Sequence, residues 1–99
     1  MFLGWLDATE SKRFGVSLAK FFLERIPKAA SKSDKDFARR VDEVLGKMAS
    51  QITEFKQQQK LNAYKKAQLA NEFKWALKDG GLPSDYADEI TSWVTRRLG

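Results

Sequence analysis

Ser17 and Lys20 are three residues apart, a spacing that in some hydrolases places a nucleophilic serine one helical turn from an activating lysine. Such enzymes also need a second domain or further loops to build an oxyanion site, and this sequence indicates neither. The adjacent carboxylates of Asp42-Glu43 and Asp88-Glu89 point about 100° apart on a helix, so neither pair converges easily on one substrate. These residues are therefore expected to serve as surface groups.

Other catalytic and cofactor chemistry also lacks its usual residues. The 99 residues include no histidine and no cysteine, which removes disulfides and the main ligands of transition metals. Gly80-Gly81 follows an expected helix, whereas nucleotide-binding loops place their glycines before one. We therefore expect a protein that is not an enzyme and that holds no metal and no organic cofactor.

Lysine is the residue type with the clearest clustering. The formal net charge is +5, and residues 56–78 alone contain six lysines against one glutamate. If this segment is one helix, four lysines fall within about 40° of each other around its axis: Lys56, Lys60, Lys74 and Lys78. With Tyr64 and Trp75 as stacking groups, such a stripe is suited to nucleic acid, and the plain alternative is a solvated helix face.

The residues that carry these groups are predicted to be helical throughout, because proline occurs only at 27 and 83 and good helix formers fill the stretches between. We expect the first helix to run from about Asp7 to Ile26. Asp7 would be its N-cap, with Glu10 reaching back in a capping box, and Pro27 would end it.

The apolar side chains of this first helix cover an unusually wide arc of roughly 220°. They leave only a narrow polar strip, formed by Arg13, Ser17, Lys20 and Glu24. Before the helix lies an apolar cluster of Phe2, Leu3, Trp5 and Leu6. Three interpretations stay open for the cluster and for Phe14 and Phe22: burial within the fold, burial against a second copy or another protein, and insertion into a membrane surface.

A long second helix is expected to begin after an N-cap at Ser33. Its apolar stripe recurs every three or four residues within an arc of about 100°: Phe37, Val41, Val44, Leu45, Met48, Ile52 and Phe55. The stripe fails beyond residue 55, where Gln59, Asn62 and Lys66 would continue it. The helix either breaks near residues 57–62 or continues across solvent, and the sequence leaves both alternatives open.

The C-terminal region is predicted to be a helical hairpin. A third apolar set, Leu69, Phe73, Ala76 and Leu77, ends at Gly80-Gly81, where a glycine can take the left-handed conformation that closes a helix. The last helix would start with Ser84 as N-cap. Its expected buried face consists of Tyr86, Ile90, Trp93, Val94 and Leu98.

These patterns predict a single all-α domain over residues 1–99, a small bundle of three to four helices. The preferred function is that of an interaction protein, a homodimer that self-associates through the first helix and the N-terminal cluster, or a partner of another protein. The alternative is a non-specific nucleic-acid-binding protein that uses residues 56–78. The first residues lack the features of a signal peptide and no apolar run reaches roughly 18 residues, so we expect a cytoplasmic protein.

Overall fold

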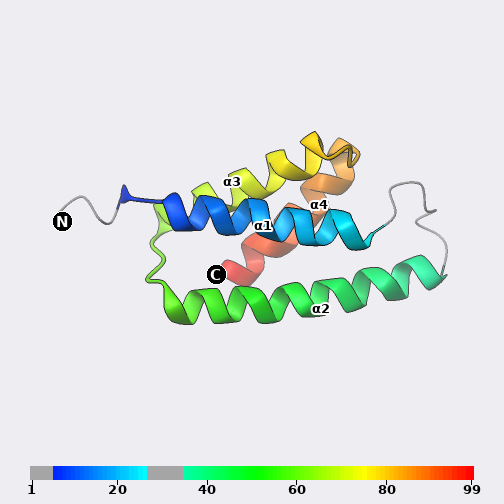
Figure 1. The fold of residues 1–99 in the computed structure, drawn as a ribbon, viewed down its shortest axis with the longest axis horizontal. Coiled ribbons are helices and arrows are strands. Elements are labelled where there is room, and N and C mark those ends of the chain that lie inside the picture. The colour runs from blue at the N-terminus through cyan, green and yellow to red at the C-terminus, as the bar shows by residue number, and fades with distance from the viewer. Residues whose placement is uncertain (1–5, 27–34) are drawn as a thin grey trace.

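The computed structural model describes residues 6–26 and 35–99, which form four α-helices and no strand (Figure 1). The helices are α1 (Thr9–Arg25), α2 (Lys35–Gln58), α3 (Ala63–Asp79) and α4 (Ser84–Leu98). The predicted all-α bundle with a long second helix and a C-terminal helical hairpin is therefore confirmed. The expected N-cap at Ser33 lies outside the described residues.

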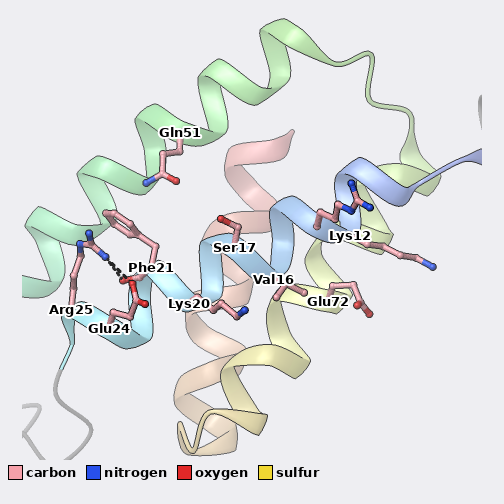
Figure 2. Close-up of a pocket in the computed structure, with 10 residues that line it drawn as sticks. Lys12, Val16, Ser17, Lys20, Phe21, Glu24, Arg25, Gln51 and Glu72 are labelled. Atoms are coloured by element: carbon pink, nitrogen blue, oxygen red, sulfur yellow. Dashed lines mark hydrogen bonds and ion pairs between the residues drawn. The ribbon is translucent and has the colours of Figure 1, made fainter.

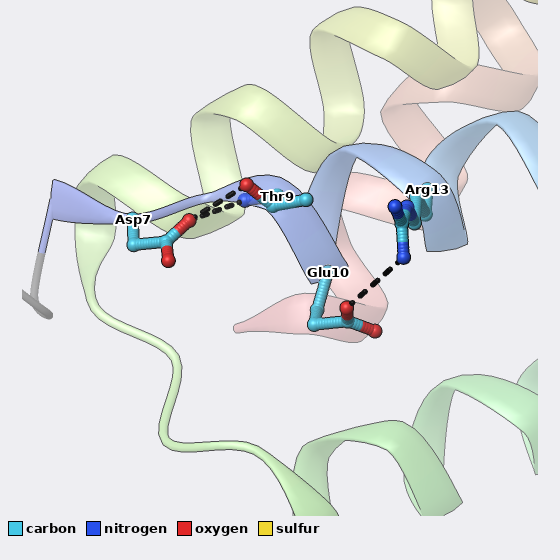
Figure 3. A network of polar contacts seen from close by, with 4 residues as sticks. All are labelled: Asp7, Thr9, Glu10 and Arg13. Atoms are coloured by element: carbon cyan, nitrogen blue, oxygen red, sulfur yellow. Dashed lines mark hydrogen bonds and ion pairs between the residues drawn. The ribbon is translucent and has the colours of Figure 1, made fainter.

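The start of α1 differs from the predicted capping box (Figure 3). One carboxylate oxygen of Asp7 accepts hydrogen bonds from the backbone N–H of Thr9 at 3.1 Å and from its hydroxyl at 2.7 Å. These bonds lower the pKa of Asp7 below its ordinary value. Ala8 occupies the N-cap position, however, and Glu10 pairs with Arg13 at 3.5 Å instead of reaching back. The predicted capping box is therefore wrong. Counted from the N-cap Ala8, Glu10 is the second helical residue and not the third, and its carboxylate is paired with Arg13.

α1 is the central helix, and it packs chiefly against α3, which runs beside it in the same direction (Figure 1). The two backbones meet at Gly15, where an added Cβ would lie 2.5 Å from the carbonyl oxygen of Leu69. Ser11 and Ala19, one turn before and after this glycine, are buried as well. A row of small residues therefore lets the two helices approach more closely than ordinary side chains allow.

α2 runs antiparallel to α1 on the other side and is joined to the core through large side chains (Figure 1). The ring of Phe55 stacks on that of Phe14, with centroids 4.2 Å apart and planes inclined by 5°. Phe37 contacts Tyr86 of α4 with centroids 6.4 Å apart. Every predicted member of the α2 stripe is either buried or packed against the core at its edge, so the stripe is confirmed.

The question left open at residues 57–62 is decided in favour of a break. α2 ends at Gln58, and residues 59–62 are not helical. Asn62 is the N-cap of α3, and its side-chain oxygen accepts a hydrogen bond from the backbone N–H of Lys65 at 2.8 Å. This N-cap satisfies one of the backbone groups that the new helix end exposes. Lys56 and Lys60 therefore do not share a helix with Lys74 and Lys78.

The turn between α3 and α4 contains a glycine in the left-handed conformation, as predicted for Gly80-Gly81. Gly81 has a φ of 96° and donates to the carbonyl of Lys78 at 3.0 Å, while Leu82 donates to Leu77 at 3.1 Å. Both bonds belong to the Schellman motif, in which the glycine takes the left-handed conformation. The N-cap of α4 is Pro83, and Ser84 is already the first helical residue, so the predicted cap at Ser84 is wrong.

Candidate functional site

The wide apolar arc of α1 divides into a buried part and a half-buried part. Leu18, Ala19 and Phe22 are fully buried, and Ile26 is nearly so. The ring of Phe22 lies edge-on to Tyr86, with centroids 6.2 Å apart, in the centre of the core. Phe22 is therefore a core residue, and its assignment to a partner surface is corrected. The reason is that α3 and α4 cover this side of α1 within one chain.

The other residues predicted for a contact surface have different positions. Phe14 is half-buried because it stacks on Phe55 of α2. Leu6 precedes α1 and is 39% exposed. Phe2, Leu3 and Trp5 lie outside the described residues. The structure thus leaves the N-terminal cluster and Phe14 as predictions, and it removes only Phe22 from them.

A groove of about 630 Å³ runs along the outer side of α1, the side that no helix covers (Figure 2). We call it the α1 groove. Its lining comes from the polar strip of α1, from Val16 and Phe21, and from one residue each of α2 and α3. The complete lining is Lys12, Arg13, Val16, Ser17, Lys20, Phe21, Glu24, Arg25, Gln51 and Glu72. The groove exists because α1 packs on α3 and α2 with its other faces.

The α1 groove carries more positive than negative charge, with four basic side chains against two carboxylates. Arg25 is held at one end, since its guanidinium lies 3.7 Å from the ring centroid of Phe21 and contacts the carboxylate of Glu24 at 3.5 Å. Lys12 and Lys20 are exposed, and within the described part of the chain the ammonium group of neither makes a hydrogen bond or an ion pair. Two cations in the groove are therefore available to an acidic ligand.

The lysines predicted to form one stripe are separated in space and partly engaged. Lys56 donates to the backbone carbonyl of Arg97 at 3.1 Å, near the C-terminal end of α4. Lys78 pairs with Asp88 at 3.3 Å, and its ammonium lies 5.3 Å from the ring centroid of Trp75. The ammonium of Lys74 lies 5.7 Å from the same centroid. Lys60 is exposed in the segment between α2 and α3.

Because α2 and α3 are separate helices, the condition for a continuous basic stripe is not met. Nucleic-acid contact by the four lysines Lys56, Lys60, Lys74 and Lys78 stays a prediction, now for two separate pairs. The carboxylate of Asp88 beside Lys78 weakens it, since a phosphate would have to displace that partner.

The residues considered for catalysis, metal binding and membrane insertion add no second candidate in the described part of the chain. Ser17 and Lys20 line the α1 groove, and both are exposed to solvent. Within residues 6–26 and 35–99, no three potential metal ligands of the His, Cys, Asp or Glu type lie close together, and no helix has the length and apolar character needed to cross a membrane. No family model, no curated protein and no solved structure matches the chain. The α1 groove is therefore the feature on which a functional argument has to rest.

Sequence reasoning identified the polar strip but not the groove. Lys12, Gln51 and Glu72 were not singled out, because nothing in a linear pattern shows that α2 and α3 bring side chains to the edges of α1. One signal was present: a narrow polar strip inside a wide apolar arc leaves apolar side chains, here Val16 and Phe21, directly beside charged ones. Such a border is where an amphipathic groove forms.

Proposed function

We propose that this chain is a non-enzymatic binding protein that docks an acidic segment of another protein in the α1 groove. The observation that carries the proposal is the pairing of half-buried Val16 and Phe21 with the available cations of Lys12 and Lys20 in one hollow. An apolar floor supplies affinity, and charges at the rim supply steering and selectivity. A segment with alternating apolar and acidic side chains matches both properties.

Charge also distinguishes this partner from other occupants. Two copies that met groove to groove would bring two sets of basic side chains together, which favours a different protein over self-association at this site. A nucleic acid would place phosphates against the carboxylates of Glu24 and Glu72 and would leave the Phe21 ring unused for any phosphate contact. An acidic polypeptide also faces these two carboxylates, but its acidic side chains can be spaced to meet Lys12 and Lys20 while its apolar side chains pack on Val16 and Phe21.

The proposal is tested with a synthetic amphipathic peptide of Leu, Glu and Asp, labelled for fluorescence anisotropy. A control peptide has the same pattern with Lys in place of the acids. We expect the acidic peptide to bind and the basic one not to bind, with affinity falling as salt is raised, because exposed charge pairs are screened. Charge reversal of the two available groove cations (Lys12→Glu with Lys20→Glu) should weaken binding about tenfold or more.

The matched control is Arg40→Glu with Lys47→Glu, two exposed basic residues of α2 that do not line the α1 groove. This double variant lowers the net charge by as much as the groove variant does and should reduce peptide binding only slightly. Equal losses in the control and groove variants would mean that overall charge, not the groove, attracts the peptide. Binding of RNA by the unmodified chain that is lost with the groove variant would also overturn the proposal, in favour of a nucleic-acid ligand.

A further inference from the structure

A basic surface, separate from the α1 groove, lies where α2 ends, α3 begins and α4 ends. These three segments are at the same end of the molecule (Figure 1). Two hydrogen bonds join them, from Lys56 of α2 to the carbonyl of Arg97 and from Lys66 of α3 to the carbonyl of Gly99, each at 3.1 Å. The exposed basic residues of these segments, which we call the basic end, are Lys56, Lys60, Arg96 and Arg97.

The positive charge of the basic end has no acidic partner among the described residues. The ion pairs of the described part of the chain involve other basic residues, namely Arg13, Arg25, Arg39 and Lys78. The partner of Lys56 is a neutral carbonyl, which occupies one of its three N–H donors and leaves its charge. The guanidinium of Arg97 lies 5.2 Å from the ring centroid of Trp93, which orients it without neutralising it.

The carboxylates of the same end do not offset this charge. Glu54 precedes Lys56 by two residues, so the two side chains point to opposite sides of α2. At the start of α1, the carboxylates of Asp7 and Glu10 interact with basic residues outside the basic end, Lys65 and Arg13. Four cations gathered from two helices and a loop are therefore available to an anionic ligand.

The neutral groups beside these cations suit a nucleic acid. Residues 57–59 are three exposed glutamines, whose amides can bond to sugars and bases. Tyr64 is 40% exposed and follows Lys60 by four residues, so their Cα atoms are at most about 14 Å apart. Its ring can stack on an unpaired base. Leu61, the apolar residue of the loop, packs against the core instead.

Other anionic partners match the basic end less well. Binding to a bilayer surface uses exposed apolar side chains next to the basic ones, but the loop between α2 and α3 presents amides there. An acidic protein segment would form exposed ion pairs without an apolar floor, and such pairs contribute little affinity. A chain of phosphates releases condensed counterions at each contact, and this gain requires no apolar floor.

We propose that the basic end binds single-stranded nucleic acid, with its four cations on phosphates and Tyr64 stacked on a base. This surface differs from the stripe predicted from the sequence, since Arg96 and Arg97 of α4 replace Lys74 and Lys78. The end of α4 lies beside the end of α2, and this packing brings the arginines to the lysines. The α1 groove takes no part, so failure of either proposal leaves the other intact.

Fluorescence anisotropy with a labelled oligouridylate at low salt tests the proposal. Lys60→Gln with Arg96→Gln removes two charges whose side chains bond to no described residue, so the far-ultraviolet circular dichroism should not change. RNA binding should weaken about tenfold. The plot of log affinity against log salt concentration should become shallower by about 1.4, because each phosphate contact on a single strand contributes about 0.7.

The matched control is Arg40→Gln with Lys47→Gln, two exposed basic residues of α2 outside the basic end. It lowers the net charge equally and should keep the salt dependence of the unmodified chain. Equal changes in the control and in the test variant would overturn the proposal, because overall charge would then attract the RNA. So would a loss with Lys74→Gln as large as that with Lys60→Gln, which would place the RNA along α3.

Substitution of Tyr64 separates a nucleic acid from other polyanions. Tyr64→Ala should weaken RNA binding severalfold and leave the binding of inorganic polyphosphate unchanged, since polyphosphate has no bases to stack. Tyr64→Phe keeps the ring and should bind RNA like the unmodified chain. Equal binding of RNA by the alanine variant and the unmodified chain would overturn the stacking role of Tyr64.

Three further outcomes would overturn the proposal as a whole. The first is the absence of RNA binding by the unmodified chain at low salt. The second is binding to vesicles that contain phosphatidylserine, but not to RNA, which would assign the basic end to a membrane surface. The third is RNA binding that Lys12→Glu with Lys20→Glu abolishes and Lys60→Gln with Arg96→Gln leaves intact, which would place the RNA in the α1 groove.

Discussion

At the scale of single residues, position in the fold decides what each lysine does. Lys56 of α2 and Lys66 of α3 both donate to carbonyl oxygens at the end of α4, to Arg97 and Gly99, each at 3.1 Å. The last carbonyls of a helix lack partners within the helix and carry its negative dipole end, so two ammonium groups stabilise them there. Lysines that look alike in the sequence thus differ in role, since these two bind the end of α4 whereas Lys12 and Lys20 line the α1 groove.

Tyr86 gives a prediction for the dependence of stability on pH. Burial raises its pKa above the ordinary value of 10.0, and the negative charge of Glu89 raises it further. Below pH 10 both the folded and the unfolded chain hold the phenol proton. As pH rises further, the unfolded chain releases the proton while the folded chain keeps it, so the free energy of unfolding falls until the pKa of the folded state is passed.

Urea unfolding at pH 8 and above pH 10 should therefore show a loss of stability in the unmodified chain that is smaller in Tyr86→Phe. Lysines also titrate in this range, but they do so in both proteins, and the difference between the two isolates the phenol. An identical loss in the two proteins would contradict the assigned effect of Tyr86.

At the scale of helices, the contact between α1 and α3 depends on one glycine. Gly15 lies in the interior of a helix, where glycine costs about 1 kcal/mol relative to alanine. The structure supplies the reason, because a Cβ there would overlap the backbone of Leu69 on α3. The sequence does contain a signal for this contact: Ser11, Gly15 and Ala19 are small residues spaced four apart on one side of α1.

Gly15→Ala is expected to destabilise the protein by about 1 to 3 kcal/mol, because the atoms that the new methyl group meets are backbone atoms and α1 must move away from α3. Gly46→Ala is the matched control on α2. Nothing lies within 4 Å of its added Cβ, and the gain in helix propensity should stabilise the protein by about 0.5 to 1 kcal/mol. Chemical denaturation measures the free energy of unfolding of both variants. If both substitutions changed it in the same direction, the close approach of α1 and α3 at Gly15 would not contribute to stability as proposed.

At the scale of the whole molecule, one core connects all four helices. Phe22 lies within it, fully buried against Tyr86. Phe22→Ala is expected to cost about 3 to 5 kcal/mol, a large part of the 5 to 10 kcal/mol that stabilises a domain of this size. Because the side chain is buried within one chain, this loss should not vary with protein concentration. Thermal unfolding of the variant at widely spaced protein concentrations tests this prediction. A melting temperature that rises with concentration would mean that Phe22 contributes to an interface between chains.

Local patterns predicted the helices and most of their inner faces. The α2 stripe from Phe37 to Phe55, the inner face of α4 and the left-handed glycine at the α3–α4 turn all follow from residue spacing and backbone preferences. Helix starts were predicted less well. Ala8 and not Asp7 is the N-cap of α1, and Glu10 pairs with Arg13 instead of completing a capping box. Pro83 and not Ser84 is the N-cap of α4. The break before α3 could not be decided, since residues 57–62 contain good helix formers and asparagine at 62 also suits the N-cap of a new helix.

What the sequence alone determined is the set of four helices and the periodic face of each, because these depend on neighbours three and four residues away. What only the tertiary structure decided is the use of the α1 arc and of the lysines. Phe22 lies in the core, whereas Val16 and Phe21 line a groove. The close approach of α3 at Gly15 and the stacking of Phe14 on Phe55 of α2 determine how much of α1 the other helices cover. Such distances between helices depend on the shapes of side chains that are far apart in sequence, and no linear pattern contains them.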